Sequence, residues 1–337
     1  MFKHIFKFSL LISLTSLIFL ILFFSCSQDK GEKTQEAIDS AKVYLNKLKC
    51  DLAITALEDV GRDKKHAKYL QTLASAYACK SGYTAPIFYG ANLNKIVATR
   101  TGFLGSLTKF TTSLMTDPED AYYLNLKTAI EILMYAGDVS VPTTAERLKV
   151  FSQQESDDIN IQLIYMVLTQ LGKYVFYYGN ADPTNGIKGS GTEANGNPNH
   201  LTNGCFYNYN PVSAIIKLAI DNDRANSALP LGSCTTTATG HPKLQPIPNA
   251  NTIKRMCEGV VLFNLFSDLI SNTTIPSGAG DLGNINTTFS SVCSGNSLAA
   301  ELCTIRTQSS CETNYAIPPE SDKLEAYFYL VYETLFI

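Results

Sequence analysis

Apolar residues recur at intervals of three and four positions along most of residues 34–178, which is the spacing of one face of an α-helix. Near the start of this region the pattern predicts three successive helices, at residues 34–48, 51–60 and 63–81. Gly61 and Gly82 are expected to end the second and third helices, because glycine readily adopts the backbone conformation that follows a helix. This part of the chain is therefore expected to consist of helices joined by short turns.

The same spacing continues to Tyr178 and predicts further helices. For one of them, Asp117 is a suitable N-cap and Pro118 a suitable first residue. The helix that ends at Tyr178 is apolar around most of its circumference, so we expect it at the centre of the core. The predicted helices lie at residues 96–114, 117–136, 143–151 and 157–178.

Beyond Tyr178 the composition changes, and long segments rich in Gly, Asn, Thr and Pro separate the apolar stretches. These segments are expected to be loops, at residues 179–210, 225–250 and 272–295. Helices are predicted between and after them, at residues 211–224, 252–271, 297–306 and 320–337. We therefore predict an all-α fold with a helical region at 35–178 and a loop-rich region at 179–337 that packs on it.

The first 26 residues have the pattern of a secretory signal. Lys3 and Lys7 precede an apolar run at residues 8–24, and polar residues follow directly after Cys26. Ser25 before Cys26 resembles the lipobox of bacterial lipoproteins. The resemblance implies a signal peptide at 1–25, lipidation of Cys26 and a short tether at 26–34. An uncleaved membrane anchor and an ordinary cleaved signal are the alternatives, since the apolar run is almost long enough to span a bilayer.

Each of these interpretations places the residues after Cys26 outside the cytosol. By resemblance to the lipoproteins, Ser27 after the lipidated Cys26 implies sorting to the outer membrane. We therefore expect a protein of the bacterial cell envelope, anchored in the outer membrane through lipid on Cys26 and facing the periplasm or the cell surface.

If the chain is exported, the remaining cysteines are expected to form disulfides, because disulfides persist in oxidising compartments. Eight cysteines follow Cys26, an even number that predicts four disulfides, although the pairing of most cannot be read from sequence alone. A zinc site is disfavoured, since no two cysteines are spaced as C-x-x-C and the histidines are isolated. The eight are Cys50, Cys79, Cys205, Cys234, Cys257, Cys293, Cys303 and Cys311.

Residues 37–83 resemble the tetratricopeptide helix–turn–helix repeat. The residues that carry the resemblance are Ala53, Leu57, Leu70, Leu73, Ala74 and Tyr77. It implies antiparallel helix hairpins in which Ala53 and Ala74 sit where two helices approach closely. The first and third helices would then run parallel, which implies that Cys50 and Cys79 lie at one end and form a disulfide. An unrelated antiparallel helix pair is the alternative.

Charge and motifs exclude several classes of function. Without Lys3 and Lys7, 25 basic residues face 30 acidic ones, and no basic block occurs, so a nucleic-acid partner is not expected. Ser106 and Lys109 have the S-x-x-K spacing of penicillin-binding enzymes, but the accompanying motifs of that class are missing. Asp182–Gly186 is interpreted as a turn and not as a calcium loop. We expect no catalytic residue, no cofactor and no metal.

These observations favour a non-enzymatic envelope lipoprotein that acts as a binding or scaffold module for another envelope protein. A small-solute or transporter-accessory binding protein, and a periplasmic hydrolase that uses carboxylates, are the alternatives. Aromatic runs at 174–178 and 327–332 are candidates for lining a binding groove. Packing between helices is the other interpretation of these runs, and the one that we favour.

Overall fold

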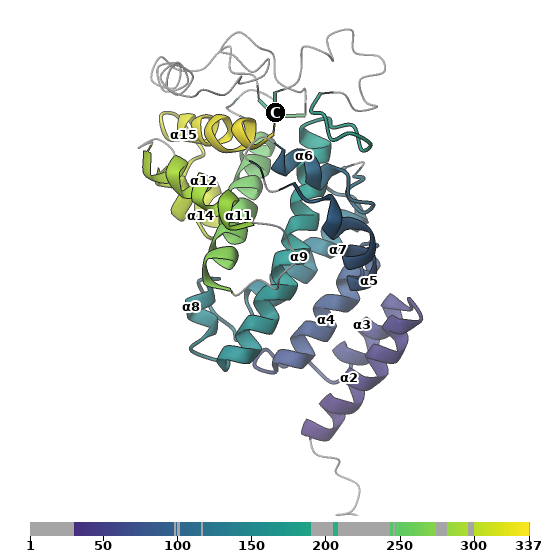
Figure 1. Ribbon diagram of the computed structural model, residues 1–337. Coiled ribbons are helices and arrows are strands. Elements are labelled where there is room, and N and C mark those ends of the chain that lie inside the picture. The colour runs from purple at the N-terminus through teal and green to yellow at the C-terminus, as the bar shows by residue number, and fades with distance from the viewer. Residues whose placement is uncertain are drawn as a thin grey trace, which may run out of the picture.

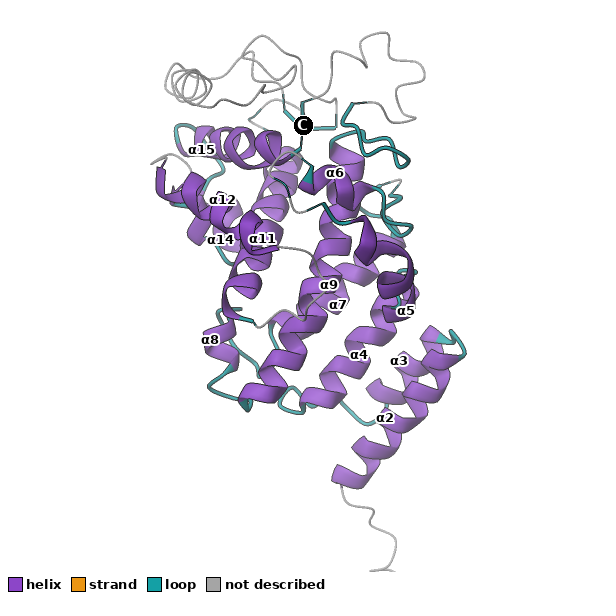
Figure 2. Cartoon of the chain, in the orientation of Figure 1, coloured by secondary structure: helices purple, strands orange, loops and turns teal. Residues whose placement is uncertain are grey.

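The computed structural model of the chain describes residues 30–97, 99, 102–115, 117–189, 205–207, 243–244, 247, 249–273, 282–295 and 300–336. Within these ranges the regular elements are helices and no strand occurs, so the all-α prediction is confirmed for this part of the chain (Figure 2). The predicted signal peptide at 1–25, Cys26, Cys234 and the predicted helix at 211–224 lie outside the described residues.

The α-helices in chain order are α2 (Lys30–Asn46), α3 (Cys50–Glu58), α4 (Ala67–Lys80), α5 (Ala85–Ile87), α6 (Phe103–Thr108), α7 (Ala121–Met134), α8 (Thr144–Arg147), α9 (Gln153–Tyr178), α11 (Ala250–Asn272), α12 (Leu282–Gly295), α14 (Gln308–Asn314) and α15 (Glu320–Tyr327). Within the described residues, shorter elements of 3₁₀ or π type accompany them: η1 (Phe88–Asn92), η2 (Leu93–Lys95), η5 (Leu302–Thr304) and η6 (Phe328–Glu333).

The long helix α9 runs through the middle of the molecule (Figure 1). α7 and α4 lie on one side of it, α11 lies on the other, and α6 crosses it near its C-terminal end. The hairpin of α2 and α3 packs against α4 and forms the outer edge of this side. Buried apolar residues from all these helices belong to one hydrophobic cluster, so the C-terminal half packs on the N-terminal half.

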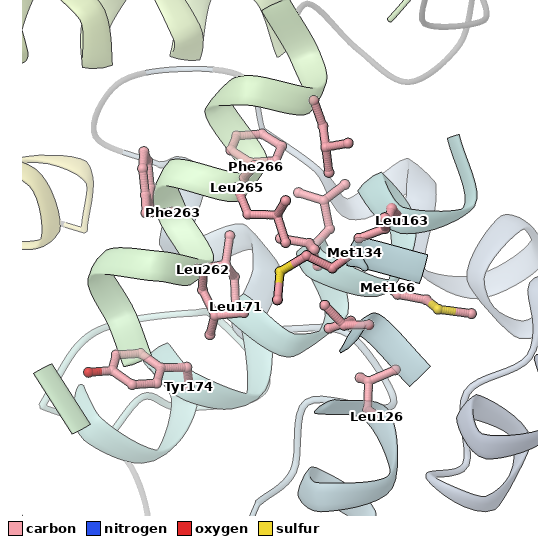
Figure 3. Close-up of a cluster of buried hydrophobic side chains, with 14 of the residues drawn as sticks. Leu126, Met134, Leu163, Met166, Leu171, Tyr174, Leu262, Phe263, Leu265 and Phe266 are labelled. Atoms are coloured by element: carbon pink, nitrogen blue, oxygen red, sulfur yellow. The ribbon is translucent and has the colours of Figure 1, made fainter. Parts of the chain in front are cut away.

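α9 begins earlier than the sequence predicts because its N-terminus has a complete capping box. The Ser152 side chain accepts a hydrogen bond from the Glu155 backbone N–H, and the Glu155 carboxylate accepts one from the Ser152 backbone N–H. From Ile159 onward the helix is buried on nearly every side. Figure 3 shows side chains of α7, α9 and α11 meeting in one cluster: Leu126, Met134, Leu163, Met166, Leu171, Tyr174, Leu262, Phe263, Leu265 and Phe266.

α11 approaches α9 and η6 closely at Gly259. A Cβ atom on Gly259 would lie 2.8 Å from the Tyr174 hydroxyl and 3.0 Å from the Phe328 ring. Tyr174 donates a 2.8 Å hydrogen bond to the backbone oxygen of Arg255, and Tyr332 donates one of 2.7 Å to that of Gly259. Residues of both aromatic runs therefore pack against one another and α11, as the packing interpretation predicts.

The end of the chain is attached to the loop region by a buried ion pair. Lys188 Nζ lies 2.5 Å from Glu333 Oε2, and the backbone N–H of Phe206 donates a 2.7 Å hydrogen bond to Glu333 Oε1. The Lys188 ammonium also faces the rings of Phe206 and Phe336, 5.7 and 5.8 Å from their centroids. A buried carboxylate needs such partners, so this contact fixes η6 against residues 188 and 206.

Disulfides join Cys50 to Cys79, Cys257 to Cys311 and Cys293 to Cys303, and Cys205 is also disulfide-bonded. The Cys50–Cys79 pairing is the one that the hairpin arrangement implied. The bridged residues are 29, 54 and 10 positions apart. In the chain-entropy model these loops give stabilisations of about 3.6, 4.2 and 2.7 kcal/mol.

Several sequence-based boundaries are wrong, and burial explains the largest error. Residues 272–295 were expected to be a loop, but Leu282–Gly295 forms α12. Its Leu282, Ile285 and Phe289 are buried at helical spacing, and this tertiary burial outweighs the low helix propensity of the segment. Cys311 lies on α14, in a segment between the predicted helices 297–306 and 320–337 where no helix was expected.

Two further predictions are wrong: the extent of the helix at 96–114 and the residue that caps the helix predicted at 117–136. Of the described residues in 96–114, only Phe103–Thr108 are α-helical. Beyond the end of this helix the Asn92 side chain accepts the Thr111 backbone N–H at 2.9 Å, so this N–H is bonded outside the helical pattern. α7 is capped by Asp120 and not by Asp117, since the Asp120 carboxylate accepts the Tyr122 N–H at 2.6 Å.

The turn between α2 and α3 places Leu48 in an uncommon backbone conformation. Its N–H bonds to the Leu45 carbonyl at 2.9 Å, and the Lys49 N–H bonds to the Tyr44 carbonyl at 2.9 Å, which is the Schellman pattern. Leu48 occupies the position where glycine is usual, with φ of 54°, and its side chain is 68% exposed. A leucine therefore occupies a place where its backbone is strained and its side chain meets water.

Replacing Leu48 by glycine is expected to stabilise the protein. The Leu48→Gly variant should raise the free energy of unfolding by about 0.5–1 kcal/mol, because glycine removes the left-handed strain. Leu52, which is also exposed but lies inside α3, is the matched control, and Leu52→Gly should lower the free energy by about 1 kcal/mol. Denaturant unfolding measures both changes, and equal losses in the two variants would contradict the assignment of strain to Leu48.

Candidate functional site

A groove of about 610 Å³ opens beside the Cys50–Cys79 disulfide. It lies between the C-terminal end of α2, the C-terminal half of α4, the α5–η1 segment and the N-terminal half of α9. We call it the hairpin groove. Its lining residues are Leu45, Asn46, Leu48, Ser75, Cys79, Tyr83, Thr84, Ala85, Pro86, Ile87, Tyr89, Asp158, Ile161, Gln162 and Tyr165.

One face of α9 forms the floor of the hairpin groove. Asp158, Ile161, Gln162 and Tyr165 are spaced by three, four and seven positions, which places them on one side of the helix. The Gln162 amide donates hydrogen bonds to the Gln71 backbone oxygen at 3.1 Å and to the Ser75 hydroxyl at 2.9 Å. These two bonds attach the floor to α4, so the groove is held open by fixed elements and does not depend on loops alone.

Aromatic rings form one wall of the groove. The Tyr165 ring lies 4.7 Å from that of Phe88 and 5.1 Å from that of Tyr89, the latter edge to face. Tyr83 packs on Phe88 at 6.0 Å. Burial raises the pKa of the Tyr83 and Tyr165 hydroxyls well above the ordinary value, so both are neutral groups at physiological pH.

The rim of the groove carries large apolar side chains in contact with solvent. Leu48 is 68% exposed, Tyr89 51% and Ile87 38%, and all three line the same opening. Single exposed apolar residues are common on protein surfaces, but a group of them around a cavity marks an interaction site. Among the described residues that line the groove, Asp158 is the only acidic or basic one, and no hydrogen bond or ion pair of its side chain occurs within the described part of the chain.

A smaller cavity of about 80 Å³ bears on the carboxylate hydrolase interpretation. Glu131 and Glu258 both line it, and burial raises the pKa of Glu131. Glu258, however, is already neutralised by Lys127 at 3.1 Å and by Arg255 at 3.3 Å. A space of this size holds a few water molecules, so the cluster acts as a polar contact between α7, α11 and α14 and not as a substrate site.

Glu325 is the carboxyl whose pKa is raised furthest into the physiological range. Burial raises the pKa of Glu325 to about 7. Its Oε1 accepts a 2.8 Å hydrogen bond from Tyr207, whose hydroxyl accepts the Ile247 N–H at 2.9 Å, and its Oε2 has no hydrogen-bond partner among the described residues. Glu325 does not line the hairpin groove or the 80 Å³ cavity, so we interpret it as a buried structural acid.

The weaker sequence motifs have structural roles. Ser106 donates to the Phe103 carbonyl at 2.7 Å and accepts the Val97 N–H at 3.0 Å, which leaves it no free role as a nucleophile next to Lys109. The Asp182 carboxylate accepts the Thr184 N–H at 2.7 Å within a turn. In the part of the chain that the structure describes, no group of three or more His, Cys, Asp or Glu side chains is arranged to hold a metal ion.

The sequence did not single out the hairpin groove. Its residues come from segments up to 120 positions apart, from Leu45 to Tyr165, and only the fold brings them together. The one available signal was on α9, where polar Asp158 and Gln162 interrupt the apolar pattern on the same face as Ile161 and Tyr165. The aromatic runs at 174–178 and 327–332, considered as groove candidates, do not contribute to its lining.

No protein-family model matches the chain, and no similar curated protein or solved structure was found. Among the described helices, none combines the length and the apolar composition needed to cross a membrane.

The protonation of Glu325 predicts a pH dependence of stability. The folded pKa of about 7 lies above the ordinary value of 4.5, so this side chain holds a proton in the folded state that the unfolded chain releases between these two values. Its stabilising contribution is complete below pH 4.5 and is lost as the pH rises through 7, a change of up to about 3 kcal/mol.

Urea unfolding of the wild type and of Glu325→Gln between pH 4 and pH 8 measures this contribution. Glutamine stays neutral at every pH. The two proteins should therefore have similar free energies of unfolding at low pH, and the variant should be the more stable of the two above pH 7. Parallel stability curves would show that Glu325 is ionised in the folded protein.

Proposed function

We propose that the protein is a lipid-anchored component of the bacterial cell envelope that binds another envelope protein through the hairpin groove and has no catalytic activity. The observation that carries the proposal is the apolar rim of the groove, where Leu48, Ile87 and Tyr89 meet solvent around a single opening. A partner that covers the rim would remove this apolar surface from water, and such burial drives most protein association.

The position of the groove supports an anchored binding role. Lipidation of Cys26 would leave few residues before α2, a tether of at most about 14 Å. α2 has 17 residues, about 25 Å of helix, and the groove lies at its far end beside Leu45 and Leu48. The groove would therefore stand away from the lipid surface, within reach of a neighbouring envelope protein.

The tetratricopeptide resemblance agrees with this proposal at the level of individual residues. Ala53 and Ala74 are completely buried, as positions of close helix approach require, and α2, α3 and α4 pack as successive neighbours. Repeats of this kind use the surface between helices to hold peptides. We propose that residues 37–83 are a tetratricopeptide-like unit, with α7, which packs along α4, in the place of a following helix.

Capture of a small solute is the second candidate function, because a cavity of about 610 Å³ has the size of small-molecule sites in proteins. A small apolar molecule would occupy the floor between Ile161 and Tyr165. It would leave the exposed rim residues Leu48 and Tyr89 in contact with water, which is why we favour the larger partner.

Site-specific photocrosslinking in the native cells tests the proposal. A photoreactive phenylalanine derivative in place of Ile87 should give a discrete protein adduct in the envelope fraction. The same group in place of Tyr122, which is exposed but outside the groove, should not give that adduct. Identical adducts from both positions, or none from the groove, would contradict a groove-bound protein partner. Mass spectrometry of the mature N-terminus tests the proposed lipid on Cys26 separately.

A further inference from the structure

We propose that the hairpin groove selects a peptide segment that presents apolar side chains to the rim and a basic side chain to Asp158. This inference rests on the proposed function and names the chemistry of the partner. It follows from three features of the groove: the sign of its charge, the strain at its edge and its length.

The charge of the groove favours a basic group. Asp158 is exposed, lies at one end of the floor, and has no ion-pair partner within the described residues. No lysine or arginine is among the described residues that line the groove. The neighbouring Lys80 is paired with Asp51 at 2.7 Å, outside the lining. An incoming lysine or arginine therefore meets a carboxylate that has no ion-pair partner among the described residues, and the opposite charges attract.

The strain at Leu48 indicates that its side chain is needed at the rim. Glycine in the same Schellman turn would remove the left-handed strain at φ of 54°, yet the chain carries a leucine that is 68% exposed. Leu48 lines the same opening as Ile161 and Tyr165 of α9. A bound apolar side chain would cover Leu48, which makes it a specificity-determining contact of the groove.

The length of the floor matches a short segment of polypeptide. Asp158 and Tyr165 are seven residues apart on α9, a rise of about 10 Å. This distance equals about three residues of extended chain. A basic side chain at Asp158 therefore places the next apolar side chains of an extended segment at Ile161, at Tyr165 and under Leu48.

Panning of a random 12-residue peptide library against the full-length protein in detergent micelles tests the inference. Peptides that depend on the groove are those that bind the wild type and Val141→Glu, an exposed site elsewhere, but not Ile87→Glu at the rim. We expect these peptides to be enriched in apolar residues together with lysine or arginine.

Titration of one selected peptide against point variants measures the two contacts. Asp158→Asn should weaken binding two- to fivefold and remove its salt dependence, as expected for a solvent-accessible ion pair. Leu48→Gly should weaken binding at least tenfold through lost apolar contact, while Leu52→Gly leaves it unchanged. Because Leu48→Gly is expected to be more stable than the wild type, this loss would not come from unfolding.

Three negative outcomes test this inference and separate it from the proposed function. Groove-dependent peptides without basic residues, bound equally by Asp158→Asn, would overturn the inference and leave peptide binding in place. The absence of any groove-dependent peptide would overturn both. Unchanged affinity in Leu48→Gly would show that this leucine is not a contact and would also overturn the inference.

Discussion

The burial of α9 is the constraint on which the rest of the structure depends. Its 26 residues are flanked by α4, α6 and α7 on one side and by α11 on the other, and its apolar side chains connect both halves of the chain into one core. Glycines allow the closest approaches. A Cβ on Gly172 would lie 2.7 Å from the Leu107 backbone oxygen of α6, and Gly259 of α11 accommodates the Tyr174 ring. Larger residues at either position would separate the helices that α9 holds together.

The candidate site lies where the N-terminal part of α9 is only partly buried. Toward its N-terminal end α9 is less completely buried: Asp158 is exposed, and Ile161 and Gln162 are half-buried and line the groove. The Cys50–Cys79 disulfide and the α2–α3 turn supply the opposite wall. A rigid core element thus provides the floor, and Leu48 completes the rim in a strained conformation. Sites commonly combine a rigid scaffold with local strain in this way.

Much of the fold could be predicted from the sequence, because helical periodicity is a local signal. The helices from α2 to α4 and the central place of α9 follow from residues close together in the chain, and the Cys50–Cys79 pairing is what the tetratricopeptide resemblance implied. The errors arose where distant contacts decide the structure. α12 is helical because Leu282 and Phe289 are buried by other elements, and beyond the end of α6 the Thr111 N–H is bonded to the Asn92 side chain, outside the helical pattern. The hairpin groove could not be predicted, since its walls belong to four separate segments and the opening exists only after they pack.

Hydrogen–deuterium exchange of the intact, oxidised protein tests most directly whether α9 joins both halves into one core. We predict that the amides of residues 159–175 exchange most slowly of all, and that those of α11 exchange with them in a single cooperative unfolding event. If α2–α4 stayed protected while α9 and α11 exchanged, the two halves would be independent units. The account of a shared core, and of a groove supported by it, would then be wrong.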